Sequence, residues 1–254
     1  MVRMIMHGCN GAMGRTISGM VKDMDGITIV AGIDLNPAEQ SEYPQFASLE
    51  ECGVEADVVV DFASAKAADH LLDYCGEKKL PLVLCTTGLS EEQIAKVQET
   101  SKKTAVLRSA NMSLGINTLL KLLKDAAKVL TNAGFDIEIV EKHHYQKMDA
   151  PSGTALALAD SINEAMNEQY HYKYDRTAER AKRDPQEIGI SAVRGGSIVG
   201  EHEVIFAGRD EVVTFTHTAY SKAIFAKGAL QAAVFLAGKK AGLYDMADVI
   251  DAAS

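Results

Sequence analysis

Residues 4–15 read MIMHGCNGAMGR, an apolar run that leads directly into a glycine-rich turn. Gly8, Gly11 and Gly14 follow one another at three-residue spacing, and a helical pattern begins near Arg15. Glycines at a strand-to-helix junction let the backbone turn tightly and approach a pyrophosphate, whose charge then faces the helix N-terminus. The usual spacing is G-x-G-x-x-G, so this loop predicts a dinucleotide-binding fold only together with its surroundings.

Asp34 supplies the next part of the pattern, because it follows the apolar run ITIVAGI (27–33). A carboxylate at the end of the second strand accepts hydrogen bonds from the adenosine ribose in dinucleotide-binding domains. Asp34 could instead cap a turn or a helix. The glycine loop that precedes it favours the ribose role.

Up to residue 113, short apolar runs alternate with helical segments, and this rhythm predicts a parallel sheet. Ser90 and Gln93 have the spacing of a capping box, which marks one helix start. Ligands of such sheets bind beyond the carboxyl ends of the strands. The apolar runs are 4–7, 27–33, 57–62, 80–85 and 104–109, and small polar loops follow three of them: DFAS (61–64), TTG (86–88) and SANMS (109–113).

The remainder of the chain has a different pattern. Its segments are a helix at 113–130, a strand at 135–141, a helix at 155–167, an irregular surface excursion at 168–187, three strands at 188–194, 197–208 and 211–220, and a final helix at 222–242 with a glycine stop. Short glycine-containing turns between the three strands favour an antiparallel meander. We therefore predict an α/β fold with two domains. A Rossmann-type parallel-sheet domain comprises 1–113 with 222–254, and an α+β domain with a largely antiparallel or mixed sheet comprises 114–221.

Composition narrows the range of functions. The 254 residues are 47% hydrophobic and 24% charged, which is typical of a globular protein, and the net charge of −9 argues against a nucleic-acid partner. No apolar run has the length of a membrane span, and the start MVR is too short for a signal peptide. The four cysteines lack CxxC spacing. We expect them to be reduced structural thiols in a cytoplasmic protein.

Residues 141–155, EKHHYQKMDAPSGTA, combine groups that can exchange protons. Each of His143 and His144 taken alone would most simply be a solvated side chain at a strand end. A metal site fits poorly, because adjacent strand residues point to opposite faces and no HExxH spacing is present. Together with Lys147, however, the histidines could act as a proton relay.

The second half of this stretch predicts an anion site. Ser152 is a natural N-cap, so a helix should start beside it. The N–H groups of Gly153 and Thr154, with the Thr154 hydroxyl, would then form a socket for a carboxylate. A proton relay beside such a socket, in a chain with a dinucleotide domain, indicates the reduction of a small acid.

The pattern E-x-H-H-x-x-K-x-D-A-P-S-G-T-A resembles the signature of the 4-hydroxy-tetrahydrodipicolinate reductase family of lysine and diaminopimelate biosynthesis. The resemblance extends along the whole chain. It implies that the N-terminal domain and the last helix bind NAD(P)H, and that the middle domain binds substrate and builds a homotetramer. Shorter matching pieces occur in order: GCNGAMGR (8–15), VVVDF (58–62), TTG (86–88), SANMSLGIN (109–117), VRGGSIVGEHEV (193–204) and GLYDMADV (242–249).

The resemblance also implies roles for individual residues. His143 matches the family's proton donor or acceptor and Lys147 its second catalytic group, while His144, Gly153 and Thr154 match its substrate-carboxylate binders. The cofactor-binding matches are the pyrophosphate loop Gly8, Cys9, Asn10, Gly11, Ala12 and Met13, the ribose acid Asp34, and the nicotinamide-side loops Cys85, Thr86, Thr87, Ser109, Ala110, Asn111 and Met112. Cys85 replaces the glycine that usually precedes the two threonines, and Met112 stands where an aromatic residue is frequent.

We expect both NADH and NADPH to bind, with NADH preferred, because the segment after Asp34 (LNP, 35–37) contains no cation for a 2′-phosphate. Arg15 lies one turn into the helix and could still reach. The expected substrate is a small cyclic dicarboxylate. Two other interpretations are another two-domain NAD(P) dehydrogenase of an amino-acid-like substrate, and a catalytically silent NAD(H)-binding sensor. The combination of HHxxK with PSGT disfavours the first, and the joint presence of His143 and Lys147 disfavours the second.

Overall fold

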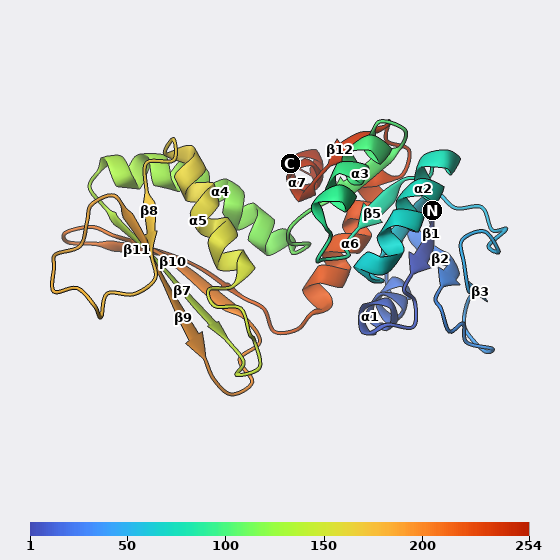
Figure 1. Ribbon diagram of the computed structural model, residues 1–254, viewed down its shortest axis with the longest axis horizontal. Coiled ribbons are helices and arrows are strands. Elements are labelled where there is room, and N and C mark those ends of the chain that lie inside the picture. Colours follow the sequence, from blue (N-terminus) through green and yellow to red (C-terminus); the bar gives the residue numbers. More distant parts are fainter. Residues whose placement is uncertain (254) are drawn as a thin grey trace. The chain divides into compact units, whose positions relative to one another are not determined.

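In the computed structural model, which describes residues 1–253, the chain divides into two units (Figure 1). One unit contains Met1–Leu114 and the segment that begins at Lys222, and the other contains Gly115–Ser221. The chain therefore leaves the first unit once and returns to it for its C-terminal helices. Among the described residues, no helix combines the length and the apolar character needed to cross a membrane.

The first unit is built on a seven-stranded sheet in the order β12-β6-β5-β4-β1-β2-β3, and every neighbouring pair is parallel. This confirms the predicted Rossmann-type sheet. Its strands are β1 (Val2–His7), β2 (Ile27–Ile33), β3 (Gln45–Phe46), β4 (Val58–Asp61), β5 (Leu82–Leu84), β6 (Ala105–Arg108) and β12 (Gly242–Tyr244). Its helices are α1 (Ala12–Val21), α2 (Ala65–Lys78), α3 (Glu91–Ser101), α6 (Ala223–Leu236) and α7 (Met246–Ala253).

Both faces of this sheet are buried. Met4 and Met6 of β1 pack with residues of α1, α6 and α7, whereas Ile5 packs on the other face with residues of α2 and α3. A strand that is covered on both sides needs apolar residues at every position, which explains the continuous apolar runs in the sequence. Helix α6 lies against α1, so the last long helix returns to the first as the sequence suggested.

The C-terminal segment differs from the prediction. Helix α6 ends at Leu236 rather than near residue 242, because Gly238 adopts a left-handed φ of 79° just beyond the helix. The following residues form β12, which pairs in parallel with β6, and then α7. Neither β12 nor α7 was predicted from the sequence. Strand β12 has only three residues, too few to show a period.

The second unit contains a five-stranded sheet in the order β11-β10-β7-β9-β8. It is a mixed sheet, one of the two forms that the sequence predicted. Its strands are β7 (Asp136–His143), β8 (His171–Lys173), β9 (Glu187–Arg194), β10 (Glu201–Ala207) and β11 (Val212–Thr218). Its helices are α4 (Leu114–Asn132) and α5 (Gly153–Ala165).

The predicted meander is wrong for its first strand. Strands β10 and β11 form the expected antiparallel hairpin, but β9 pairs in parallel with β7, and β7 separates it from β10. The crossover through α5 delivers β9 in the same direction as β7, as parallel pairing requires. The supposed irregular segment 168–187 also contains β8. The nearby Arg183 donates to Ile137 O and to Glu187 O, each a backbone carbonyl.

One face of the second sheet is covered by the chain itself. Ile137 and Ile139 of β7, with Val204 and Phe206 of β10, pack against α4 and α5. The alternating residues of β7 and β10 on the other face are partly exposed and include Lys142, whose ammonium pairs with Glu201 and Glu203. The apolar face of these strands is therefore covered within the same chain.

A glycine in the middle of α6 sets how closely this helix approaches the 109–113 loop. A Cβ atom at Gly228 would lie 1.7 Å from Met112 O, a backbone atom that cannot move independently. We expect Gly228→Ala to lower the free energy of unfolding by about 1–3 kcal/mol or more, the usual range for overpacking. Gly19→Ala in α1 is the matched control, because nothing lies within 4 Å of that site.

This control should be neutral or stabilising, since alanine is the better helix former. Urea denaturation of both purified variants measures the effect. Equal stability of the two variants would show that α6 can shift away from the loop at no cost.

Candidate functional site

The glycine loop after β1 is shaped by close backbone contacts. Gly8 has a φ of 81°, a conformation that residues with a side chain rarely adopt. A Cβ atom at Gly14 would lie 2.3 Å from Gly8 O, so helix α1 can follow the turn this tightly only with glycine there. These contacts account for two of the three glycines that the sequence singled out.

The N-terminus of α1 has no side-chain cap. Its N-cap is Gly11, and its first turn contains no acidic residue. Helix α3 in the same unit is the contrast, because Ser90 and Gln93 form the predicted capping box there. First-turn N–H groups lack intrahelical acceptors, so an uncapped helix end after a glycine turn fits a pyrophosphate.

Asp34 lies beside this loop. Its carboxylate accepts hydrogen bonds from Asn10 N at 3.0 Å and Asn36 N at 3.1 Å. The Asn10 side chain in turn donates to Asn36 O and to Gln45 Oε1. Each carboxylate oxygen has a second lone pair, so Asp34 can hold the loop and still accept from ribose hydroxyls.

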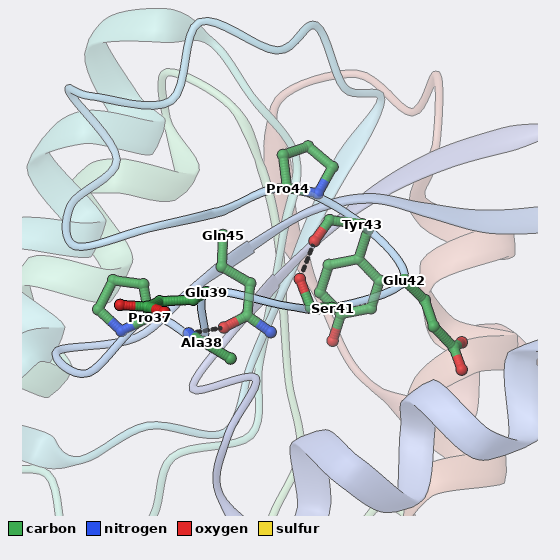
Figure 2. Close-up of a pocket in the computed structure, with 8 residues that line it drawn as sticks. All are labelled: Pro37, Ala38, Glu39, Ser41, Glu42, Tyr43, Pro44 and Gln45. Carbon is green, nitrogen blue, oxygen red and sulfur yellow. Dashed lines mark hydrogen bonds between the residues drawn. The ribbon is translucent and has the colours of Figure 1, made fainter.

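Two hollows lie along the 37–45 segment, which follows Asp34 in the chain. One of about 560 Å³ is lined by eight residues of the 37–45 segment, where Ala38 N donates to Gln45 Oε1 (Figure 2). The other, of about 330 Å³, lies between that segment and the glycine loop. Arg15 and Lys22 both line the second hollow, and Lys22 is paired with Glu42. The sequence pointed to Arg15 but not to Lys22, which is the C-cap of α1.

The loops at the carboxyl ends of β5 and β6 present further groups. Thr86 is buried, and its Oγ1 has no hydrogen-bond partner among the described residues. Such an orphan hydroxyl can bind a polar ligand atom. Cys85 is half-buried, and burial raises the pKa of its thiol, so it is not a reactive thiolate.

The other predicted residues of this edge differ in exposure. Thr87 and Ala110 are exposed, Ser109 and Asn111 are partly exposed, and Met112 is buried. Asn111 Oδ1 accepts a hydrogen bond from Ser113 N. The side chain of Asn111 therefore shapes its own loop.

In the second unit, the Glu141 carboxylate is fully buried and lies at the centre of a polar cluster. Its Oε2 is 2.6 Å from His143 Nδ1, and its Oε1 accepts from Ser152 N at 3.0 Å. Arg194 grips both oxygens, with distances of 2.7 Å from Nη1 and 2.6 Å from Nη2. Burial raises the pKa of Glu141, but the bonds from Arg194, His143 and Ser152 outweigh it, so the pKa is lowered overall.

The ionised Glu141 carboxylate determines which ring nitrogen of His143 carries the proton. An ionised carboxylate only accepts hydrogen bonds, so His143 Nδ1 must carry the proton. Nε2 is then the atom that can exchange a proton with a ligand. A Cβ atom at Gly200 would lie 3.2 Å from this Nε2, so glycine leaves room beside it.

His202 packs edge-on against His143, with 5.1 Å between ring centroids. Its Nε2 is 2.9 Å from Ser152 Oγ, and that oxygen also accepts from Ala155 N as the predicted cap of α5. Burial first, and then the nearby His143, lower the pKa of His202 to about 4. His202 is therefore neutral near pH 7.

Lys147 and the start of α5 form the outer part of the cluster. Lys147 Nζ is 2.8 Å from Asp149 Oδ1. His144 is partly exposed, and its buried Nδ1 has no partner among the described residues. Gly153, exposed, and Thr154, partly exposed, are the first two residues of α5. All five residues predicted for this site thus lie on the end of β7, the following turn and the start of α5.

Sequence reasoning missed three members of the cluster as functional candidates: Glu141, Arg194 and His202. Glu141 precedes His143 by two positions, so strand periodicity places both on one face. Arg194 and His202 belong to a stretch that was noted only for its family resemblance. Their chemical roles depend on the pairing of β9 and β10 with β7.

Comparisons with known proteins agree with this arrangement. The family model described as "Dihydrodipicolinate reductase, N-terminus" matches residues 2–112, and "Dihydrodipicolinate reductase, C-terminus" matches residues 115–250. The chain belongs to the dihydrodipicolinate reductase family. Two curated members of the family are named 4-hydroxy-tetrahydrodipicolinate reductase. The one from Caldanaerobacter subterraneus is 52% identical over 98% of both chains, and the one from Clostridium tetani is 51% identical over 97% of this chain and 96% of its own.

A solved structure of the family has the same fold. The dipicolinate-bound dihydrodipicolinate reductase from Paenisporosarcina sp. TG-14 superposes with a TM-score of 0.80 at 24% identity, over 96% of this chain and 97% of that chain. At this identity the likeness concerns the fold. The identity of the family rests on the family models and on the curated relatives.

The buried His202 makes the stability of the chain depend on pH. Between its folded pKa of about 4 and its ordinary value of 6.5, the unfolded chain binds a proton that the folded chain rejects. The free energy of unfolding should therefore fall as the pH is lowered from 7.5 to 4.5, with about 2–3 kcal/mol of the loss due to this group. Urea denaturation at both pH values measures the loss.

His202→Gln should show a smaller loss between the two pH values, whatever its stability at pH 7.5. His171→Gln on β8 is the control, because His171 is exposed and its replacement should leave the pH dependence unchanged. If His202→Gln loses as much unfolding free energy between the two pH values as the wild type, other groups, such as Glu141, cause the pH dependence.

Proposed function

We propose that the chain reduces 4-hydroxy-tetrahydrodipicolinate to tetrahydrodipicolinate with NAD(P)H, a step of lysine and diaminopimelate biosynthesis. The observation that carries the proposal is that Glu141 holds His143 in the same cluster as Lys147 and the start of α5. Relatives of about 50% identity bear the name of this reductase. A catalytically silent sensor would have no need for a buried carboxylate that holds a histidine in one tautomer.

His143 and Lys147 are proposed as the catalytic pair. The nicotinamide supplies a hydride to the substrate when the cofactor is bound. His143, held at Nδ1 by Glu141, presents Nε2 for proton exchange with the substrate. Glu141 also stabilises the positive charge that forms if Nε2 is protonated, because the buried anion is only 2.6 Å away. Lys147 contributes a second positive charge or proton.

The substrate's carboxylates are assigned to His144, Gly153 and Thr154. The positive end of the α5 dipole favours an anion at Gly153 and Thr154. The Nδ1 of His144, which has no partner among the described residues, supports this assignment, since buried polar atoms normally have a partner. Together these groups would orient one side of the ring toward His143.

The cofactor is assigned to the first unit. Residues 8–13 would hold the pyrophosphate, Asp34 the adenosine ribose, and the loops 85–87 and 109–112 the nicotinamide side. The uncapped start of α1 and the orphan hydroxyl of Thr86 support these assignments. We place the reaction in the cytoplasm, because all four cysteines are free and three are buried.

We further propose that the chain forms a homotetramer through the second unit, as the family resemblance suggests. The supporting surface is the sheet face that α4 and α5 leave uncovered. It includes Val140 and Ile205, with the ion pairs of Lys142 beside them. Light scattering at micromolar concentration tests this proposal, and a monomeric mass would refute it.

The test of the function is oxidation of NADH, followed at 340 nm, with freshly generated substrate. We expect the wild-type chain to turn over and Lys147→Ala to lower kcat by about 10²-fold or more, the scale of a lost positioned acid. NADH binding should survive. Lys124→Ala is the matched control, because Lys124 forms a similar ion pair at 2.7 Å with Glu164 in the same unit. A near-normal kcat in Lys147→Ala would contradict the catalytic role proposed for Lys147.

Cofactor preference is the second expectation. The Asp34 carboxylate repels a 2′-phosphate. Of the two cations that line the hollow between the glycine loop and the 37–45 segment, Lys22 is paired with Glu42, which leaves Arg15 as the remaining cation there among the described residues. We expect kcat/KM to favour NADH by about tenfold, roughly 1.4 kcal/mol. Measuring kcat/KM with NADH and with NADPH at matched ionic strength tests this expectation. A preference for NADPH would contradict the expectation and make Arg15→Ala the next variant.

A further inference from the structure

Asp149 presents a carboxylate to groups that the proposed function assigns to the substrate. Its Oδ1 lies 2.8 Å from Lys147 Nζ. The hydrogen bond from Lys147, as the largest cause, holds the pKa of the Asp149 carboxyl below its ordinary value, and the backbone N–H of Gly153 contributes in the same direction. The Asp149 carboxylate thus engages the proposed catalytic lysine, shortly before the start of α5.

The main chain of Asp149 is anchored, whereas its side chain is not enclosed. Arg194 Nη2 donates to Asp149 O at 2.6 Å, which ties this backbone to the buried Glu141 pair. The Asp149 side chain is 57% exposed, compared with 23% for Lys147. It can therefore rotate into solvent while the backbone stays in place.

Helix α5 does not depend on the Asp149 side chain for its start. Ser152 is its N-cap and accepts from Ala155 N through its side chain. Glu141 accepts from Ser152 N. Release of the Asp149 carboxylate would therefore leave the helix capped and would leave Lys147 and Gly153 available to another anion.

We propose, on the basis of the proposed function, that Asp149 is a resident carboxylate that the substrate's carboxylate displaces from Lys147. Asp149 keeps the lysine paired when no substrate is present. Its competition weakens the binding of dicarboxylate ligands. An exposed ion pair is a weak competitor, so the expected effect on affinity is about threefold to fivefold.

The experiment compares four full-length proteins: wild type, Asp149→Asn, Asp149→Ala and the control Asp73→Asn. The control removes an acid from a closely similar ion pair, since Asp73 Oδ2 lies 2.7 Å from Lys96 with exposures of 61% and 29%. Calorimetric titration with dipicolinate gives the dissociation constant. Steady-state kinetics with the proposed substrate give KM and kcat separately.

We expect both Asp149 variants to bind dipicolinate about threefold to fivefold more tightly than wild type, and to show a similar fall in KM with kcat within about twofold. The control should match wild type in all three quantities. Asparagine keeps the size of the side chain and one acceptor oxygen without the charge, so Asp149→Asn also reports the effect in a variant with little structural change.

Two results would overturn the inference. Unchanged or weaker dipicolinate binding in both Asp149 variants, with a lowered kcat in an active wild-type background, would show that Asp149 positions Lys147 for the reaction. A wild-type chain that neither binds dipicolinate nor reduces the substrate would overturn the proposed function and this inference with it.

Discussion

The site of the second unit depends on one buried carboxylate. Placing an ion in the protein interior costs several kcal/mol, and only close partners with good geometry offset that cost. Glu141 has such partners on three elements: His143 on β7, Arg194 on β9 and the backbone of Ser152 at the start of α5. Without any one of these partners the buried carboxylate would lack a hydrogen bond, and without Arg194 it would lack its cation. The interaction therefore fixes the relative positions of two strands and a helix end.

This arrangement gives the cluster an inner part and an outer part. The inner part, with Glu141, His143 and His202, is buried, and its hydrogen bonds hold the carboxylate and the two rings in place. The outer part, with Lys147 and Asp149, is partly exposed, and ion pairs of that kind exchange partners easily. A rigid histidine beside an exchangeable lysine suits a site that must bind an anion, transfer a proton and release the product.

The first unit follows a different constraint, which is steric rather than electrostatic. Gly8 and Gly14 allow the turn after β1 to fold tightly against α1, and the helix end that results is left without a side-chain cap. In the same unit α3 is capped by Ser90 and Gln93, whereas α1, like α2 and α6, has no side-chain cap. Hollows lie along the 37–45 segment, and Arg15 and Lys22 line the one between this segment and the glycine loop.

Features that depend on neighbouring residues could be predicted from the sequence. The parallel sheet followed from continuous apolar runs, because strands that are buried on both faces need them. The caps at Ser90 and Ser152 followed from local spacing, and the grouping of His143, Lys147 and Gly153 followed from fifteen consecutive residues that span one strand end and one helix start.

The tertiary structure alone decided which distant segments meet. Arg194 contacts Glu141 across 53 residues, and Ser152 contacts His202 across 50. No local period encodes these contacts, because they depend on β9 and β10 lying on opposite sides of β7. The alternation in 188–194 specified a strand but not its partner, which is chosen by the crossover through α5 and by burial against α4 and α5. The short strand β12 likewise forms only because β6 offers an edge for it to pair with.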